Sequence, residues 1–529
     1  MNAYEGGSYL DAVNVQVVQH PERIAYENSA GERLSYGELG ALSDAWAAWL
    51  ADPSHIASHA PVVLYGHKSP FMLAGMLACA KSGHAYVPID TIYPWNRVQG
   101  IVEQLVTHGG STLVINTTES ETPSLEGVQT LLARELSSLA EASDAQQIAL
   151  APVKADDTFY ILFTSGSTGV PKGVEMPTRY VDYFTHWLIQ DYRTLATDQE
   201  REEGLVWFNR SPFSFDLSTD DLFCGLSCGD CIFALEESAE NSFKASFEAL
   251  SSSGVTDWIS TPSFVDACLA DPSFSQDLLP RLRRVMLAGE TLRKDTVHKL
   301  HERFPKAMVL NNYGPTETGT VSICEITDAM LADERSLPIG YLGPEVKGLI
   351  VDHDTLEPKA PGEFGELIIV GNVAKGYWGR PDLTQKGFKS CPEELSGGQP
   401  SYRTGDACML DASGLLYYNG RLDNMIKLHG YRIEVGEVES VLSSLAAIDM
   451  ACVLPMRRED GTVYRLMAVV QPSSSCAERG RALTRSILGQ IEDTLPSYMV
   501  PGTFRYVESI PLNPNGKADR KALANMMGI

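Results

Sequence analysis

The chain has 529 residues, of which 44% are hydrophobic and 21% are charged, and its formal net charge is −26. This length predicts several domains with a sizeable core, and the acidic balance disfavours a surface that binds nucleic acid. The sequence holds no long apolar run and no apolar leader after Met1, so we expect a cytoplasmic protein without membrane insertion.

Short apolar runs alternate with helical patterns over much of the chain. Strands are predicted at 61–65, 111–115, 255–260, 284–287 and 308–311, and helices at 70–81, 263–269 and 294–304. Residues 117–149 are rich in Ser, Glu and Ala and are expected to form a surface insertion or loop. The alternation of strands with helices predicts an α/β fold with parallel layers.

The residue pattern of the sequence changes near residue 337. Glycines punctuate short strands from there to residue 420, which predicts a β-rich subdomain. Helices then follow at 435–445 and 482–495, with strands at 451–455 and 463–470. We therefore expect an N-terminal domain over 1–422 and a compact α+β domain over 423–529.

Residues 163–173 read Phe-Thr-Ser-Gly-Ser-Thr-Gly-Val-Pro-Lys-Gly and follow the apolar run 159–162. Glycines let a backbone approach a ligand closely, and N–H groups, hydroxyls and an ammonium together suit phosphate oxygens. Lys172 is followed by Gly173 and not by Ser or Thr, so the loop does not have the Walker spacing. A flexible surface turn is the alternative for such a loop taken alone.

Three of the ten cysteines lie close together at Cys224, Cys228 and Cys231. Their spacing is compatible with a metal site, but no second Cys/His pair lies nearby in the sequence to complete a tetrahedral set of ligands. Buried structural thiols are the favoured interpretation, and scattered cysteines in a chain of this size fit a reducing cytosol.

Five motifs in a fixed order carry a resemblance to a known family. They are 164–173, 313–317 (Tyr-Gly-Pro-Thr-Glu), 402–406 (Tyr-Arg-Thr-Gly-Asp), 420–423 (Gly-Arg-Leu-Asp) and 515–517 (Asn-Gly-Lys). Together they resemble the adenylate-forming enzymes: acyl-CoA synthetases, luciferases and amino-acid adenylation domains. The resemblance covers almost the whole chain. It implies the adenylate-forming (ANL) fold, with a large N-terminal domain of layered α/β sheets plus a β-rich subdomain and a small mobile α+β C-terminal domain.

The resemblance implies ATP and Mg²⁺ as cofactors. A carboxylate oxygen of Glu317 suits Mg²⁺, the ring of Tyr313 offers adenine a stacking face, and Asp406 can accept both ribose hydroxyls. The predicted ATP-binding residues are Thr164, Ser165, Gly166, Ser167, Asn311, Asn312, Tyr313, Gly314, Pro315, Thr316, Asp406, Tyr418, Arg421 and Lys517.

Lys517 lies in a glycine-flanked loop near the end of the sequence. The residues alone favour an exposed turn, whereas the resemblance implies a cation that brings an anionic carboxylate onto the α-phosphate and stabilises the transition state. The predicted catalytic residues are Lys517, Lys172, Thr168 and Glu317. Asp423 is the predicted hinge, about which the C-terminal domain would rotate between two half-reactions.

Asp216 lies in the otherwise apolar run 212–218. A buried carboxylate needs a cationic or hydrogen-bonding partner, and the α-ammonium group of an amino acid is one. Fatty acids, acetate and luciferin have no amine, so Asp216 favours the amino-acid branch of the family. The predicted substrate-binding residues are Asp216, Leu217, Asp220, Ser263, Met286, Ala288, Gly289, Thr320 and Lys517.

Two stretches, 259–269 and 426–432, most resemble members of the family that activate D-alanine. Ala288 stands where those members typically have cysteine, Thr320 where they have valine, and Asp220 where they have an apolar residue. These changes make the pocket larger and more polar, and one methylene of pocket shape is worth only about 1–3 kcal/mol. We therefore expect D-alanine or another small or polar amino acid as the substrate.

The resemblance implies an amino acid–carrier protein ligase. Such an enzyme makes aminoacyl-AMP and pyrophosphate and then passes the aminoacyl group to the phosphopantetheine thiol of a carrier protein. The sequence ends soon after Lys517, so a separate carrier is the expected partner. Three alternatives stay open: an excised adenylation domain of a nonribosomal peptide synthetase, an acyl-CoA synthetase, and a non-catalytic nucleotide-binding sensor.

Overall fold

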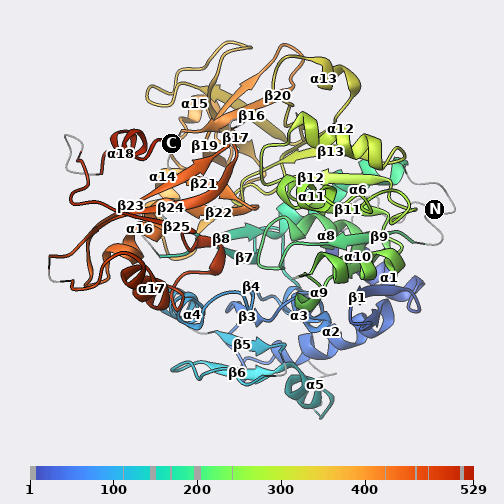
Figure 1. Ribbon diagram of the computed structural model, residues 1–529. Coiled ribbons are helices and arrows are strands. Elements are labelled where there is room, and N and C mark those ends of the chain that lie inside the picture. Colours follow the sequence, from blue (N-terminus) through green and yellow to red (C-terminus); the bar gives the residue numbers. More distant parts are fainter. Residues whose placement is uncertain are drawn as a thin grey trace. The chain divides into compact units, whose positions relative to one another are not determined.

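The computed structural model (Figure 1) describes residues 8–110, 112–118, 120–142, 150–166, 170–195, 204–240, 242–422, 425–458, 461–474, 476–512 and 518–529. The chain divides into two compact units. The first unit comprises Met1–Thr91, Val102–Leu162 and Gly173–Gly420, and the second comprises Ile92–Ile101, Phe163–Lys172 and Arg421–Ile529. The glycine-rich loop therefore belongs to the second unit. The predicted border at residue 423 stays a prediction, because Asp423 lies outside the described residues.

A nine-stranded sheet of the first unit has the order β15-β14-β13-β12-β11-β9-β10-β1-β2. Its strands are β1 (Ile24–Asn28), β2 (Arg33–Ser35), β9 (Val206–Asn209), β10 (Cys231–Ala234), β11 (Asp257–Ser260), β12 (Arg284–Leu287), β13 (Met308–Tyr313), β14 (Ser322–Glu325) and β15 (Tyr341–Leu342). The run from β1 to β13 is parallel, and the two ends of the sheet are closed by antiparallel pairs. In Figure 1 these strands run side by side, with α8, α11 and α12 beside them.

A seven-stranded sheet has the order β18-β8-β7-β4-β3-β5-β6. Its strands are β3 (Val62–Tyr65), β4 (Tyr86–Ile89), β5 (Leu113–Asn116), β6 (Gln129–Leu132), β7 (Thr158–Thr164), β8 (Lys172–Pro177) and β18 (Gly376–Tyr377). β7 and β8 flank the glycine-rich loop. Residues 117–149 were expected to form a surface insertion or loop, and the loop alternative is wrong in part, because β6 and α5 (Ala133–Ala142) lie within them. β6 extends the sheet beyond β5, with Gln129 paired to Leu113.

A four-stranded antiparallel sheet confirms the predicted β-rich subdomain. Its strands, in spatial order, are β16 (Val346–Val351), β17 (Gly365–Gly371), β19 (Ser401–Leu410) and β20 (Leu416–Arg421). β17 pairs with both β16 and β19 and is buried through Ile368 and Ile369.

Helices cover these sheets. They are α1 (Tyr9–Gln19), α2 (Tyr36–Leu50), α3 (Pro70–Lys81), α4 (Trp95–Gly109), α5, α6 (Thr178–Leu195), α8 (Ser218–Cys228), α9 (Glu237–Glu240), α10 (Phe243–Ser253), α11 (Pro262–Leu269), α12 (Lys294–Arg303), α13 (Asp328–Ala332), α14 (Pro381–Phe388) and α15 (Glu393–Ser396). The predicted helices at 70–81, 263–269 and 294–304 are confirmed. α3 begins where the sequence signals it, since Ser69 caps the Phe71 N–H and Pro70 occupies the first turn.

The second unit contains a small α/β assembly. Its elements are β21 (Met425–Leu428), β22 (Tyr431–Glu434), α16 (Val435–Ser443), β23 (Ile448–Arg457), β24 (Val463–Pro472), α17 (Gly480–Ile491), the 3₁₀ turn Ser497–Met499, β25 (Thr503–Tyr506) and α18 (Arg520–Met527). β23, β24 and β25 form one sheet, and α16 and α17 pack their apolar side chains into a shared core. The helices and strands predicted in this region are confirmed.

A tight turn follows β13 and depends on two glycines. A Cβ on Gly314 would lie 1.8 Å from the Gly319 carbonyl oxygen, and a Cβ on Gly319 would lie 1.8 Å from the Tyr180 hydroxyl. Gly319 also has φ +56°, a conformation that favours glycine. The turn therefore brings the Tyr180 hydroxyl directly against the backbone that precedes Thr320.

Candidate functional site

Asp216 lies in the turn that leads into α8. The Thr316 hydroxyl donates to its carboxylate at 2.6 Å, and its own carbonyl accepts from the Thr219 hydroxyl at 2.6 Å. The sequence predicted a buried carboxylate here, but the side chain is half-buried, because it precedes the helix and does not lie on its core-facing side. Thr316, predicted as an ATP-binding residue, contacts the predicted amine-binding group.

Asp220 follows on the first turn of α8 and is fully buried. The Thr320 hydroxyl lies 3.2 and 3.3 Å from its two carboxylate oxygens, and the Asn312 amide nitrogen lies 3.4 Å from one of them. Burial raises the pKa of Asp220 to about 7, the Thr320 hydrogen bond opposes this shift, and the charge of Asp216 adds to it. Two of the predicted pocket positions, Asp220 and Thr320, are thus in contact.

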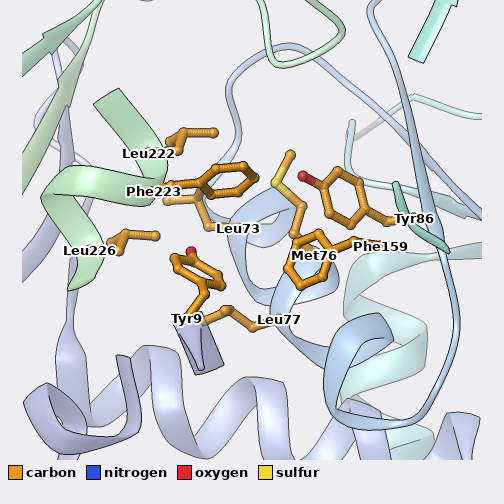
Figure 2. Close-up of a pocket in the computed structure, with 9 residues that line it drawn as sticks. All are labelled: Tyr9, Leu73, Met76, Leu77, Tyr86, Phe159, Leu222, Phe223 and Leu226. Atoms are coloured by element: carbon orange, nitrogen blue, oxygen red, sulfur yellow. The ribbon is translucent and has the colours of Figure 1, made fainter. Parts of the chain in front are cut away.

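The opposite side of α8 is apolar. Figure 2 shows a pocket that its side chains line together with side chains of α1, α3, β4 and β7. The lining residues are Tyr9, Leu73, Met76, Leu77, Tyr86, Phe159, Leu222, Phe223 and Leu226. These residues belong to the main core of the first unit, so α8 is fixed by apolar packing on one side while it carries Asp220 on another.

The other predicted substrate-binding residues lie at or near the carboxyl ends of neighbouring parallel strands. Met286 is buried in β12, and Ala288 and Gly289 follow that strand, with Gly289 at φ +86°. The Ser263 N–H, just after β11, donates to Glu290 at 3.0 Å. Leu217 is half-buried at the start of α8. The carboxyl edge of a parallel sheet is where α/β folds bind ligands.

Three predicted ATP-binding residues surround the end of β13. The Tyr313 hydroxyl donates to Asp406 at 2.5 Å, and the Tyr313 and Tyr418 rings lie 6.4 Å apart. The Asn311 amide donates to the Pro338 carbonyl at 2.7 Å, which fixes it within the fold. Gly314 and Pro315 form the tight turn that follows.

Glu317 is fully buried and accepts a hydrogen bond of 2.6 Å from the Tyr377 hydroxyl. A buried carboxylate with a hard oxygen fits Mg²⁺, which typically takes one or two protein carboxylates and completes its shell with water and phosphate oxygens. Among the described residues, no group of three or more His, Cys, Asp and Glu side chains could hold a metal ion alone.

In the described part of the glycine-rich loop, one hydroxyl is hydrogen-bonded and another is not. The Ser165 hydroxyl donates to the Arg432 carbonyl at 2.8 Å, whereas the buried Thr164 hydroxyl has no hydrogen-bond partner among the described residues. The Gly166 N–H donates to Glu437 at 3.1 Å, and a Cβ on Gly166 would lie 2.0 Å from the Val170 carbonyl oxygen. An unpartnered hydroxyl beside glycine-dependent backbone fits a phosphate ligand.

Glu437 also pairs with Arg97 at 2.5 Å, and both side chains are buried. Burial raises the pKa of Glu437, while Arg97 and the Gly166 N–H act to lower it. Arg97 and Glu437 escaped the sequence analysis, because they are 340 positions apart and belong to no motif.

Four of the predicted site residues lie outside the described residues: Ser167, Thr168, Asp423 and Lys517. Lys172 is buried as the first residue of β8, and Arg421 is the last residue of β20. Their predicted roles stay predictions.

Three tyrosines near the predicted site were also missed. Tyr377 contacts Glu317, and Tyr160 and Tyr180 lie near Asp220. Of these three, only Tyr160 had a signal in the sequence. It is the second residue of the apolar run 159–162, where a polar hydroxyl is unusual.

None of the three clustered cysteines forms a disulfide within the part of the chain that the structure describes. Cys224 is buried, and Cys228 and Cys231 are half-buried. No helix among the described residues has the length and hydropathy needed to cross a bilayer.

Sequence comparison finds two family matches. The family described as AMP-binding enzyme matches residues 13–378, and its C-terminal domain matches residues 437–517. A D-alanine–D-alanyl carrier protein ligase of Bacillus cereus (strain ATCC 10987 / NRS 248) is 36% identical over 97% of this chain and 98% of its own length. A ligase of the same name from Bacillus anthracis (strain CDC 684 / NRRL 3495) is also 36% identical, over 97% and 98% of the two chains.

Solved structures share the fold. Holo-PA1221, described as an NRPS protein with adenylation and PCP domains, aligns with TM-score 0.79 and 24% identity over 99% of this chain and 85% of its own. The o-succinylbenzoate CoA synthetase of Bacillus subtilis aligns with TM-score 0.79 and 21% identity over 97% and 98% of the two chains. The predicted fold class is confirmed.

Proposed function

The chain belongs to the AMP-binding enzyme family, and on this premise we propose that it activates an amino acid with ATP and transfers it to a carrier protein. In the first step, a carboxylate oxygen of the amino acid attacks the α-phosphorus of ATP, the bond to the β-phosphate oxygen breaks, and pyrophosphate leaves. In the second step, a thiolate of the carrier attacks the acyl carbon, AMP leaves, and a thioester forms.

The observation that carries this proposal is the Asp216–Thr316 pair. A carboxylate at hydrogen-bond distance from a threonine hydroxyl is oriented, and its partial exposure leaves it accessible to a ligand. An α-ammonium group is the natural partner of such a group, because it supplies a charge and three donors. Asp216 thus anchors the amino end of the substrate.

ATP recognition is assigned to the residues that the sequence predicted for it. Asp406 accepts the ribose hydroxyls, with Tyr313 holding its carboxylate through the hydrogen bond described above. Thr164 and Lys172 donate to phosphate oxygens, and Glu317 is the protein ligand of Mg²⁺, which neutralises phosphate charge when bound. Lys517 supplies the cation that stabilises the transition state at the α-phosphate, and Asp423 is the hinge between the two steps.

The similar proteins of Bacillus are named for D-alanine and for a D-alanyl carrier protein. This supports a small amino acid as the substrate and a separate phosphopantetheinylated carrier protein as the partner. It also supports a place of action in the cytoplasm, where ATP and such carriers occur together.

Exchange of labelled pyrophosphate into ATP tests the first step without a carrier. We expect exchange with a small amino acid. In Asp216→Asn the exchange rate should fall at least about a hundredfold, because the α-ammonium group of the substrate loses its counter-charge. Lys517→Ala should abolish exchange while ATP binding persists.

Two of the alternatives give distinct results in this assay. Exchange that depends on fatty acids and not on amino acids would identify an acyl-CoA synthetase. ATP binding without exchange for any acid would identify a nucleotide-binding sensor. Either result refutes the proposal.

A further inference from the structure

The carboxylate of Asp220 is weakly held for a buried group. Its hydrogen bonds from the Thr320 hydroxyl are 3.2 and 3.3 Å long and the one from the Asn312 amide is 3.4 Å long, whereas O–H···O bonds are ordinarily about 2.5–3.0 Å and N–H···O bonds about 2.7–3.2 Å. Asp230, a second buried carboxylate of the first unit, accepts from the Leu205 N–H and the Trp207 indole at 2.9 Å each. Asp220 therefore retains capacity for a stronger donor that the fold itself does not supply.

Two buried polar atoms near this carboxylate lack hydrogen-bond partners among the described residues. One is the Asn312 side-chain oxygen; Asn312 is only 3% exposed, and its amide nitrogen contacts Asp220. The other is the Tyr180 hydroxyl, and Tyr180 is 1% exposed and interacts electrostatically with Asp220. Buried polar groups are nearly always paired, so a ligand is a physical explanation for these two unpaired atoms.

Asp220 also lacks a counter-charge. Among the described residues, no lysine, arginine or histidine forms an ion pair with it, and the charged group that acts on it is Asp216, another carboxylate. Burial and then the charges of Asp216 and Asp220 raise the pKa of Tyr160, so both carboxylates lie near one tyrosine. A buried charge without a partner is costly unless a ligand neutralises it or donates to it.

We propose that Asp220, Thr320 and Asn312 bind the side chain of the amino-acid substrate, and that this side chain carries a hydrogen-bond donor, a hydroxyl or an ammonium group, on its β- or γ-carbon. The inference rests on the proposed function, because Asp216 is taken as the anchor of the α-amino group. The donor of the side chain bonds to Asp220, and an ammonium group has a further proton for the Asn312 oxygen.

Alanine fits this proposed side-chain site less well. Its methyl group would displace water from Asp220 and the Asn312 oxygen without replacing its hydrogen bonds, and each buried unpaired group costs about 1–3 kcal/mol. A site built to bond a polar substrate group rejects the analogue that lacks the group far better than an apolar pocket rejects an extra methylene. The substrate class is therefore a donor-bearing amino acid and not an aliphatic one.

Pyrophosphate exchange with the full chain tests this inference. Both enantiomers of alanine, serine, 2-aminobutyrate and 2,3-diaminopropionate are compared by kcat/KM. We expect serine or 2,3-diaminopropionate to exceed the aliphatic compound of matched size by at least about tenfold, the equivalent of one hydrogen bond. A higher value for serine assigns a hydroxyl substrate, and a higher value for the diamino acid assigns an ammonium substrate.

Asp220→Asn should reduce this preference at least about tenfold, since it removes the charge and keeps the shape. Asp230→Asn is the matched control, because it changes a buried carboxylate that is already satisfied, and it should leave the preference unchanged. If Asp220→Asn fails to fold, Thr320→Val provides the second variant and should reduce the preference to a smaller extent. The thermal shift of the wild-type protein with each amino acid gives an independent measure.

Two outcomes separate the inference from the function on which it rests. Exchange that prefers alanine or 2-aminobutyrate, with a preference that Asp220→Asn does not change, overturns the inference and leaves amino-acid activation intact. Exchange with no amino acid at all overturns the proposed function itself.

Discussion

Asp220 in the first unit and Glu437 in the second are both buried carboxylates, but they differ in their partners. Glu437 has Arg97 at 2.5 Å and the Gly166 N–H at 3.1 Å. Asp220 has only long hydrogen bonds from Thr320 and Asn312 and no cation among the described residues. Burial raises the pKa of each.

The difference separates a structural carboxylate from one suited to a ligand. A buried ion pair with its own cation and an N–H donor holds two segments together, and its removal leaves a charge exposed to low dielectric. A buried carboxylate without a cation lowers the stability of the empty protein, and such a cost at a functional site is offset when a ligand binds. Four predictions sharpen or break this comparison.

The largest effect is expected for Glu437→Ala. This change leaves the buried Arg97 guanidinium unpaired, which typically costs about 3–5 kcal/mol. Chemical denaturation, followed by a probe in the second unit, measures the change in the free energy of unfolding. Glu492→Ala is the control, because Glu492 is an exposed glutamate of the same unit. Equal changes in the free energy of unfolding for the two variants would contradict a structural role of Glu437.

Asp220→Asn is expected to act in the opposite direction above neutral pH. The pKa of Asp220 rises from an ordinary value of 3.8 to about 7 on folding, so the folded state holds a proton that the unfolded state has lost between these values. Wild-type stability therefore falls as the pH rises towards about 7, and roughly 2 kcal/mol is lost between about pH 5 and pH 8.

The asparagine variant has no such proton to lose. Its melting temperature should exceed that of the wild type at about pH 8 and approach or fall below it at about pH 5. The titratable groups near Asp220 are Asp216, Asp221, Cys224, Tyr160 and Tyr180. The thiol and the two tyrosines do not ionise in this range because burial raises their pKa values. Asp216 and Asp221 are present in both proteins, so the difference between the two melting curves reports on Asp220. A pH-independent difference would contradict the assignment.

Thr320→Val should have a smaller effect, and its pH dependence should be opposite in sign to that of Asp220→Asn. Loss of its hydroxyl removes a donor that favours the charged form of Asp220, so we expect a loss of about 1 kcal/mol at about pH 8 and less at about pH 5. Thermal denaturation at both pH values measures it. An equal loss at both pH values would show that Thr320 acts through packing alone.

Thr316→Val should have the smallest effect on stability and a measurable one on activity. Asp216 is half-buried, so water can replace the lost donor. The KM for the amino acid in pyrophosphate exchange should rise about fivefold, which corresponds to roughly 1 kcal/mol. An unchanged KM would mean that Thr316 does not orient Asp216.

The sequence by itself determined the layered α/β fold, the helix at 70–81 and the family, because these follow from local patterns and ordered motifs. Only the tertiary structure decided the partners of the buried charges. Thr320 is 100 positions from Asp220, and Arg97 is 340 positions from Glu437. The half-burial of Asp216 and the strand at 129–132 were decided in the same way. Burial, counter-charge and sheet pairing are set by chain segments remote in sequence, and no local pattern records which segments meet.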